Sequence, residues 1–275
     1  MKIAQFYENK RIRLGVVQSG SITPLDFEGD MVGFIGSGGV AIPLSGQPIA
    51  LDRARLAPPV TRPDKIIGIG LNYKDHAAEQ GAPLPDEPRI FAMFPSTLIG
   101  PGDPITWDAA LTSQVDYEAE LAVIIGKTIK NCPEGEALEA VFGYTCANDV
   151  SARDIQLQKA QLVRGKALDT FCPLGPWIVT ADEIPDPGAL YIRSWLNGEL
   201  MQDGHTSQLI FGVPALIAFM SRSFTLVPGD VILTGTPKGV GAFLNPPVFL
   251  KDGDTVTIEI EGLDRLTNPC RCHSL

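Results

Sequence analysis

The sequence of 275 residues has no long apolar run. Its longest apolar runs, around residues 121–125 and 213–220, are far shorter than the roughly 20 residues that a membrane-spanning helix needs. Basic residues are also scarce, with 22 lysines and arginines against 32 aspartates and glutamates and a net charge of -10. This charge repels nucleic acid and anionic membranes, so we exclude both as partners. Residues 1–6 lack the apolar core of a signal peptide, and we expect a cytoplasmic protein.

Cysteine and histidine are few as well. The five cysteines are odd in number and irregularly spaced, which argues against a disulfide framework and agrees with a reducing compartment. Cys270, Cys272 and His273 would bind a soft metal only with a fourth ligand, so we favour a frayed terminus there. Of the 3 histidines, His205 is expected in a turn, which leaves His76 as the candidate for chemistry.

Three common enzyme signatures are missing. Residues 126–128 resemble the end of a P-loop, but Leu121 stands where the first glycine of that motif is required. Residues 68–70 resemble the start of a dinucleotide fingerprint, but Tyr73 takes the place of its third glycine. No Gly-x-Ser-x-Gly sequence occurs at a strand-to-helix turn. The sequence therefore disfavours nucleotide binding and a serine nucleophile of that type.

The most informative stretch that is present covers residues 115–127, VDYEAELAVIIGK. With the two-residue period of a strand, the odd positions from 117 to 125 form one apolar face. The even positions begin with Asp116, Glu118 and Glu120 and end with Ala122 and Ile124. Because this second face becomes apolar halfway along, we expect it to be covered too, with the carboxylates at its mouth.

Two of these carboxylates predict a positive partner. Glu118 and Glu120 stand two residues apart on a strand, which places their Cα atoms about 6.7 Å apart on one face. At an effective dielectric of about 20, two such charges repel by roughly 2 to 3 kcal/mol. The pattern alone leaves two interpretations open: a solvated strand edge, or a divalent cation, which favours clustered carboxylate oxygens.

The rest of the chain predicts a mixed, strand-rich α+β protein. Its 28 glycines and 23 prolines suit a turn-dense architecture. We expect a small β-rich lobe over residues 1–62, ending in a proline-spaced connector, and a larger domain over residues 63–275. Helices are expected over residues 73–80 with Asn72 as N-cap, over residues 134–141 and 213–221, and after Ser151. Strands are expected over residues 12–17, 65–70, 143–147, 231–233 and 255–260.

His76 and Glu79 lie three residues apart on the first of these expected helices. That spacing puts both side chains on one face, where the carboxylate can orient the imidazole. A pair on a solvated helix surface is the alternative. The loop that follows, residues 81–88, is rich in proline and could cover a site as a lid.

Five motifs occur in one order along the chain. They are Gly70-Leu71-Asn72-Tyr73 with Asp75-His76-Ala77 and Glu79; Asp116-Tyr117-Glu118 with Glu120; Asn148-Asp149 with Ser151-Ala152-Arg153-Asp154; Gly165-Lys166; and Thr234-Gly235-Thr236-Pro237-Lys238-Gly239-Val240-Gly241. The series resembles the fumarylacetoacetate hydrolase family from about residue 63 to residue 262. The resemblance implies a mixed β-roll or sandwich, a small N-terminal β-rich lobe as in bacterial members, and a homodimer.

The resemblance also implies a site. Glu118, Glu120 and Asp149 match the family's ligands for Mg²⁺ or Mn²⁺, which Ca²⁺ can replace in crystals. His76 and Glu79 match the dyad that activates water. The remaining matches are Lys166 beside the metal, Arg153 and Gln156 facing the substrate, and Thr236 at the substrate carboxylate.

The implied chemistry acts on a small anionic 2-oxo acid. Such an acid can chelate the cation through its carboxylate and C2 oxygen, so that an enolate is stabilised. Water activated by His76 would then cleave the C3–C4 bond of an acylpyruvate or another 2,4-dioxo acid. The alternatives are oxaloacetate decarboxylation, isomerisation of a 2-hydroxyhepta-2,4-diene-1,7-dioate, and a non-enzymatic protein that only sequesters 2-oxo acids.

Overall fold

Strands dominate the computed structural model, which describes residues 1–39, 42–157 and 161–273. The first strands are β1 (Lys2–Glu8), β2 (Arg11–Gln18), β3 (Ser21–Pro24), β4 (Ile49–Ala50) and β5 (Leu56–Ala57). Next come β6 (Ile66–Gly70), β7 (Arg89–Met93), β8 (Leu98–Ile99), β9 (Ile105–Asp108), β10 (Val115–Asp116), β11 (Ala119–Ile125), β12 (Val141–Asn148), β13 (Ser151–Ala152) and β14 (Cys172–Thr180). The last are β15 (Tyr191–Leu196), β16 (Glu199–His205), β17 (Val231–Leu233), β18 (Thr255–Ile260) and β19 (Asp264–His273).

Helices are short by comparison. The α-helices are α1 (Met31–Gly36), α2 (Lys74–Glu79), α3 (Arg153–Gln156), α4 (Leu162–Lys166) and α5 (Val213–Ser223). The 3₁₀ helices are η1 (Leu51–Arg53), η2 (Pro95–Thr97), η3 (Glu134–Ala140), η4 (Ala181–Glu183), η5 (Thr206–Gln208) and η6 (Gly241–Phe243). In the described part of the chain, no helix has the length and apolar character that crossing a bilayer requires.

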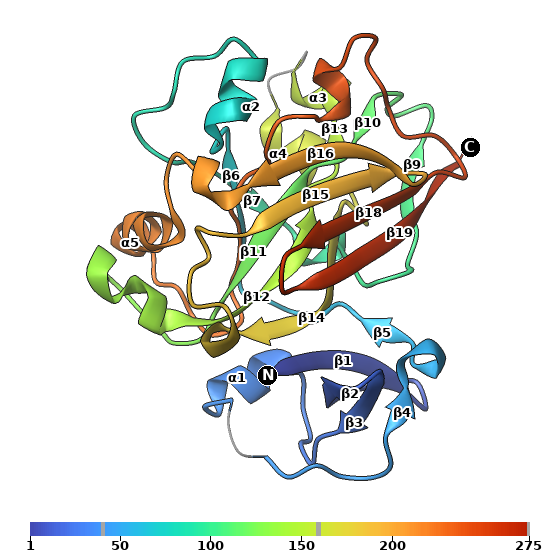
Figure 1. The fold of residues 1–275 in the computed structure, drawn as a ribbon, viewed down its shortest axis with the longest axis vertical. Helices are drawn as coiled ribbons and strands as arrows, with labels where there is room; N and C mark the ends of the chain where they lie inside the picture. Colours follow the sequence, from blue (N-terminus) through green and yellow to red (C-terminus); the bar gives the residue numbers. More distant parts are fainter. Residues whose placement is uncertain (40–41, 158–160, 274–275) are drawn as a thin grey trace.

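Two sheets organise the molecule (Figure 1). The larger runs in the order β4-β3-β2-β1-β14-β12-β11-β17-β6-β7, with β5 beside β1 and β8 beside β14. The smaller runs β16-β15-β18-β19-β9, and β10 pairs with β13 separately. Because β17 pairs with β6 in parallel while β11 is antiparallel to both its neighbours, the larger sheet is mixed, as expected.

The N-terminal strands continue the larger sheet. Lys2 and Ile3 of β1 pair with Val179 and Ile178 of β14. Figure 1 shows β1 to β4 gathered at one end of the molecule, below the remaining strands. The expected division at residue 62 stays a prediction, since this ladder joins the strands on both sides of it.

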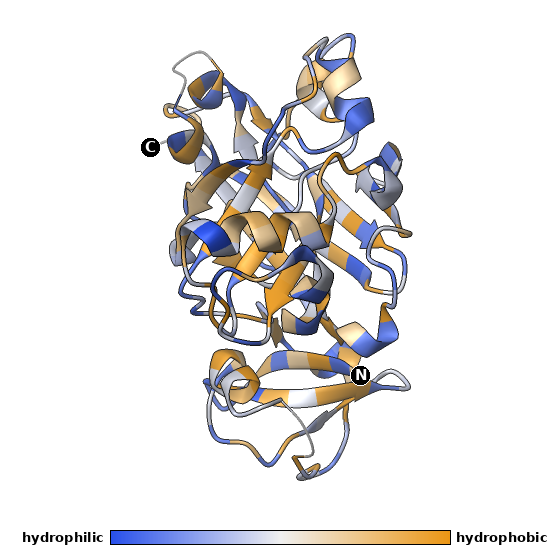
Figure 2. Cartoon of the chain, turned by 90° about the vertical axis from the view of Figure 1, so that its left-hand side faces the viewer, coloured by the Kyte–Doolittle hydropathy of each residue, from blue (hydrophilic) through white to orange (hydrophobic). Residues whose placement is uncertain are grey.

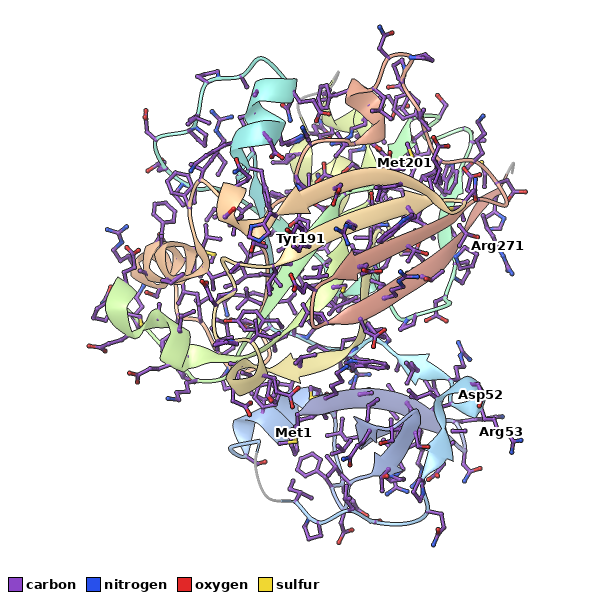
Figure 3. The ribbon with its side chains drawn as sticks, viewed as in Figure 1. Met1, Asp52, Arg53, Tyr191, Met201 and Arg271 are labelled. Carbon is purple, nitrogen blue, oxygen red and sulfur yellow. The ribbon has the colours of Figure 1, made fainter. Side chains whose placement is uncertain are left out.

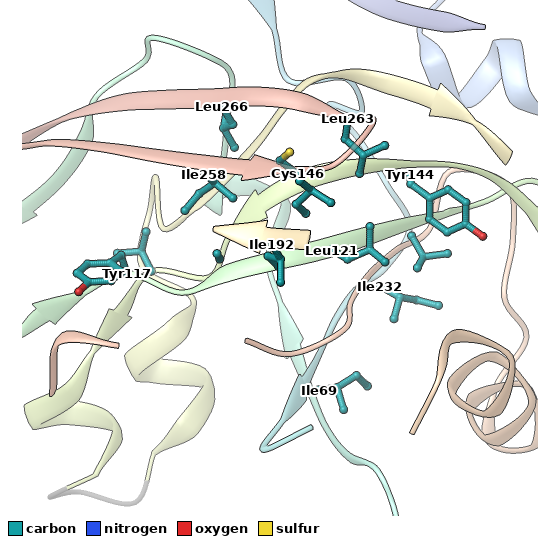
Figure 4. Close-up of a cluster of buried hydrophobic side chains, with 14 of the residues drawn as sticks. Ile69, Tyr117, Leu121, Tyr144, Cys146, Ile192, Ile232, Ile258, Leu263 and Leu266 are labelled. Atoms are coloured by element: carbon teal, nitrogen blue, oxygen red, sulfur yellow. The ribbon is translucent and has the colours of Figure 1, made fainter. Parts of the chain in front are cut away.

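The main core lies where the two sheets face each other. Leu121 and Cys146 of the larger sheet belong to the same apolar cluster as Ile192, Ile258 and Leu266 of the smaller one (Figure 4). Figure 2 shows apolar residues concentrated in the central strands, with polar residues on the connecting loops. This core supports the inner strands from one side.

β11 is buried on both faces, as the hydrophobic pattern predicted. Its odd positions join the core between the sheets, whereas Ala122 and Ile124 join a second apolar cluster on the opposite face. All seven residues of β11 are buried, so the interpretation of a solvated edge was wrong. The expected single strand is divided, since Tyr117 and Glu118 separate β10 from β11.

Two predicted helix caps were wrong. Tyr73, not Asn72, is the N-cap of α2. The Asn72 side chain instead donates to the carbonyls of Thr234 and Phe211 and accepts from the Phe211 amide, because these buried backbone groups need partners. Ser151 lies in β13, and Ala152 precedes α3.

The C-terminal segment is ordered rather than frayed, contrary to our expectation. Cys270 to His273 continue β19 and pair in parallel with residues 105–108 of β9, so backbone hydrogen bonding holds them. Cys270 is buried in the main core.

Two further predictions concern short elements. The segment over residues 134–140 is helical, but as a 3₁₀ helix. His205 ends β16 and caps η5, where its Nδ1 accepts from the Ser207 amide.

Gly143→Ala should destabilise the fold. Gly143 lies on β12 between β11 and β14, and a Cβ atom there would stand 2.3 Å from the Val179 carbonyl oxygen. A paired backbone carbonyl cannot move aside, so we expect the free energy of unfolding to fall by about 2 kcal/mol. Urea denaturation measures this directly.

Gly135→Ala is the matched control. A Cβ atom at Gly135 would meet no atom within 4 Å, so its free energy of unfolding should stay within about 0.5 kcal/mol of the parent. Equal losses in the two variants would contradict the packing described for β12.

Candidate active site

Three carboxylates converge where β11 begins and β12 ends. Ala119 pairs with Asn148, and the Asp149 amide donates to the Glu118 carbonyl at 3.0 Å, so Glu118 and Asp149 stand opposite each other. Glu120 lies two residues further along the same face of β11. One oxygen from each of the three carboxylates lies within 4.8 Å of the others, and all three residues are buried.

Two cations lie against these carboxylates. Lys166, at the end of α4, places its Nζ 2.7 Å from Glu118 Oε2 and 2.6 Å from Asp149 Oδ2. Arg153, at the start of α3, places Nη1 2.8 Å from Glu118 Oε1 and Nε 2.9 Å from Asp116 Oδ2. Asp116 also accepts from the amides of residues 117, 241 and 242, which fixes the guanidinium.

The buried charges do not balance. When all its carboxylates are ionised, the site holds four buried anions and two buried cations, which leaves two negative charges in excess: Asp116, Glu118, Glu120 and Asp149 against Arg153 and Lys166. Burial, followed by repulsion from Asp149 and Glu118, raises the pKa of Glu120 well above its ordinary value. Burial raises the pKa of Asp149 to about 7, although Lys166 opposes the shift.

Glu118 behaves differently from its neighbours. Burial acts to raise its pKa, but Lys166 and Arg153 outweigh burial and lower that pKa to about 2. The two cations therefore stabilise the ionised form of Glu118, whereas burial and repulsion destabilise the ionised form of Glu120.

The residues present fit a divalent cation. All three candidate ligands offer hard carboxylate oxygens, and Asp149 Oδ1 is a buried atom without a hydrogen-bond partner among the described residues. A doubly charged ion would also neutralise the excess of two negative charges. Glu118, Glu120 and Asp149 would hold it. The described residues show no such cluster around Cys270, Cys272 and His273.

These groups line one cavity of about 190 Å³. Eight of the nine predicted site residues line it: His76, Glu118, Glu120, Asp149, Arg153, Gln156, Lys166 and Thr236. The ninth, Glu79, does not line the cavity but contacts Nδ1 of His76. A larger hollow of about 660 Å³ beside α5 contains none of them, so size alone does not mark the site.

His76 and Glu79 form a buried pair rather than a surface pair. His76 is only 4% exposed, and its Nδ1 lies 2.9 Å from Glu79 Oε2. The other oxygen of Glu79 accepts from the Gly239 amide at 2.9 Å. A carboxylate at Nδ1 selects the tautomer that carries the proton there, which leaves Nε2 as an acceptor facing Gln80 Nε2 at 2.6 Å.

Several contributing residues were not predicted from the sequence. Gln80 contacts the free nitrogen of His76, and Phe243 packs its ring edge to face against the imidazole. Gln202, from the smaller sheet, donates to Thr236 Oγ1. No sequence pattern pointed to Gln202, since residues 199–205, ELMQDGH, do not alternate in polarity. Gln156, which was predicted, accepts from Arg153 Nη1 at 2.9 Å.

Comparison with known proteins identifies the family. The family model for the fumarylacetoacetate hydrolase C-terminal domain matches residues 65–271. The chain belongs to the fumarylacetoacetate hydrolase family. The solved structure of fumarylacetoacetate hydrolase from Exiguobacterium antarcticum superposes with a TM-score of 0.91 at 39% identity, over 99% of this chain and 100% of that one.

Two curated members of the fumarylacetoacetate hydrolase family are more similar in sequence. The mitochondrial oxaloacetate tautomerase fahd2 of Xenopus laevis is 54% identical over 216 residues, which are 78% of this chain and 67% of the relative. Oxaloacetate tautomerase YisK of Bacillus subtilis is 45% identical over 222 residues, 80% of this chain and 74% of the relative.

Glu120→Gln should weaken Mn²⁺ binding by at least about 100-fold, because it removes a charged ligand. Loss of a residue that only bonds to a ligand typically weakens metal binding by about 10- to 100-fold, and loss of the ligand itself should cost more. The same variant should not destabilise the metal-free protein, because Glu120 is repelled by two neighbouring carboxylates. Calorimetric titration with Mn²⁺ and thermal melting in EDTA measure the two effects. Glu139→Gln, at an exposed position, is the control and should leave both unchanged.

Mn²⁺ affinity should also fall as the pH is lowered through 7. The pKa of Asp149, raised to about 7, means that protons compete with the metal for its oxygens in that range, and the raised pKa of Glu120 acts in the same direction. Titrations at pH 8 and pH 6 should therefore give a tighter dissociation constant at the higher pH. Equal affinity at both values would count against Glu120 and Asp149 as ligands.

Proposed function

We propose that this protein interconverts the keto and enol forms of a short 2-oxo acid that carries a second carboxylate, such as oxaloacetate. The buried triad, which fits Mg²⁺ or Mn²⁺, carries the proposal, because it gives a 2-oxo acid a place to bind through two oxygens. The two curated relatives named as oxaloacetate tautomerases support this substrate. The cavity of about 190 Å³ also suits a small acid, since pockets for drug-sized ligands begin near 300 Å³.

The cation, when bound, supplies positive charge for the carboxylate and C2 oxygen of the acid. Lys166 adds a further positive charge beside that oxygen, and it is held in place by Glu118 and Asp149. Arg153 has a buried Nη2 with no hydrogen-bond partner among the described residues, so it can bind a carboxylate of the substrate. Gln156 orients this guanidinium by accepting from Nη1.

His76 is the proton carrier in this proposal. Its Nδ1–H is directed at Glu79, so Nε2 takes a proton from C3 once substrate displaces the Gln80 amide. Nε2 then gives this proton to the C2 oxygen, so the keto form becomes the enol, His76 returns to its starting state and no atoms are gained or lost. No water enters this reaction, and the cavity needs room only for the acid.

Hydrolysis of an acylpyruvate, which the sequence placed first, is the second candidate. The specific observation in its favour is the same buried dyad, since Glu79 also orients His76 to take a proton from water. Water would then attack C4, the C3–C4 bond would break, and pyruvate would leave. Oxaloacetate decarboxylation and dienedioate isomerisation use the same enolate. The homodimer, which the resemblance implies, and the cytoplasmic location, which residues 1–6 and the cysteine pattern suggest, remain proposals.

Activity on oxaloacetate should require both a cation and His76. We expect EDTA to abolish tautomerisation, followed through the ultraviolet absorbance of the enol, and His76→Ala to lower kcat by about 100-fold or more. Mn²⁺ affinity of His76→Ala should stay within about twofold, because His76 is not a candidate ligand. His273→Ala, at an exposed histidine, should match the parent in both measurements.

Products formed in ¹⁸O water separate the two candidates. Tautomerisation leaves the carbon skeleton intact, whereas acylpyruvate hydrolysis releases pyruvate and a carboxylic acid that carries one solvent oxygen. Rapid ¹⁸O incorporation from acylpyruvates with slow turnover of oxaloacetate would reverse our ranking. Full activity in EDTA would contradict both.

A further inference from the structure

Gln202 is a buried polar residue on a strand that is otherwise largely open to solvent. Its neighbours on β16 include Leu200, which is 48% exposed, and Met201, which is labelled in Figure 3. Gln202 itself is 0% exposed. A strand that exposes leucine and buries glutamine breaks the usual pattern, and such exceptions are concentrated at functional sites.

The contacts of Gln202 define the direction of every hydrogen bond it makes. Its Oε1 accepts from the Ala119 amide at 2.9 Å, and its Nε2 donates to the Pro237 carbonyl at 2.8 Å. Because one partner can only donate and the other can only accept, the side-chain amide cannot be reversed. The second hydrogen on Nε2 is therefore donated to Thr236 Oγ1, at 2.7 Å.

This direction determines what the Thr236 hydroxyl can do. Since its oxygen accepts from Gln202, its own hydrogen needs another acceptor, and none is found among the described residues. Thr236 lines the cavity that holds the carboxylate triad and is only 3% exposed. The hydroxyl is thus available as a donor to a bound anion.

Gln202 also joins the two walls of the cavity. Ala119 lies between Glu118 and Glu120 on β11, and Thr236 follows Gly235, whose amide donates to Glu120 Oε2. The loop that carries Thr236 packs tightly on β16, since a Cβ atom at Gly239 would lie 2.3 Å from the Met201 carbonyl. A change in Gln202 would alter the position of the hydroxyl relative to the carboxylates.

We propose that Gln202 is a positioning residue that presents the Thr236 hydroxyl as a donor to the carboxylate of the 2-oxo acid. The proposal rests on the proposed function for the class of ligand. Gln202 does not line the cavity, so its effect passes through Thr236. The sequence resemblance assigned Thr236 and left Gln202 without a role.

A binding measurement tests the proposal without depending on which reaction occurs. Oxalate is the probe, because it is a small anion with the carboxylate and adjacent oxygen of an enolised 2-oxo acid. With Mn²⁺ saturating, Gln202→Met and Thr236→Val should each weaken oxalate binding by about tenfold, as expected for loss of a hydrogen bond to a charged group. The double variant should also lose about tenfold rather than the product of the two effects.

Gln5→Met is the matched control. Gln5 is a 0% exposed glutamine on β1 that also bonds two backbone groups, the Pro58 carbonyl and the Met31 amide, far from the site. Its replacement should lower the melting temperature as Gln202→Met does, yet leave oxalate affinity unchanged. Thr236→Ser keeps the hydroxyl and should bind oxalate within about threefold of the parent.

Gln202→Glu provides a second variant if Gln202→Met fails to fold. The carboxylate can still accept from Ala119 but would draw the Thr236 hydrogen away from the cavity, so oxalate binding should again weaken. The proposal is overturned if oxalate affinity is unchanged in the folded variants, if the effects multiply in the double variant, or if Mn²⁺ affinity falls in parallel.

Turnover separates this proposal from the proposed function. If oxaloacetate is a substrate, the KM of Gln202→Met should rise with a smaller change in kcat. If the parent protein does not turn over oxaloacetate while oxalate binding follows the pattern above, the proposed function fails and the role of Gln202 stands. If the parent turns over oxaloacetate while oxalate binding is insensitive to Gln202, the proposed function stands and the role of Gln202 fails.

Discussion

Repulsion among buried carboxylates at the start of β11 is the constraint on which this structure depends. Glu118, Glu120 and Asp149 approach one another where water cannot screen them, which is costly unless opposite charge is supplied. The short helices α3 and α4 supply part of it through Arg153 and Lys166. The remaining excess of negative charge fits a small doubly charged ion.

The larger sheet makes this arrangement rigid. β11 is hydrogen-bonded to β12 and β17 and is covered by apolar clusters on both faces, so its backbone has little freedom to relax away from the charges. The His76–Glu79 pair lies on a helix of six residues, and Glu79 bonds this helix to the loop at Gly239. The carboxylates and His76 therefore stand on different elements, at strand ends of the larger sheet and on a short helix.

Much of this could be predicted from the sequence because period-two hydrophobicity and charge repulsion are local signals. The two-sided burial of β11 and the pairing of Glu118 with Glu120 follow from one stretch, and the motif series located eight residues of the cavity lining. The caps of α2 and α3 could not be predicted from local sequence. Asn72 donates to the carbonyls of Phe211 and Thr234, which are distant in the chain, and Ser151 donates to the Asp149 carbonyl before it rather than to the helix after it. The role of Gln202 could not be predicted either, because its hydrogen-bond partners lie 83 and 34 residues away in the chain.

The rim of the cavity contrasts with its floor. Gln80, Arg89 and Leu157 line the opening and are exposed, whereas the triad below them is enclosed by strands on either side. Exchanges at the rim alter the shape and charge met by the far end of an incoming acid without disturbing the folding core. A scaffold divided in this way can acquire new specificities through a few outer substitutions while its buried carboxylates stay unchanged.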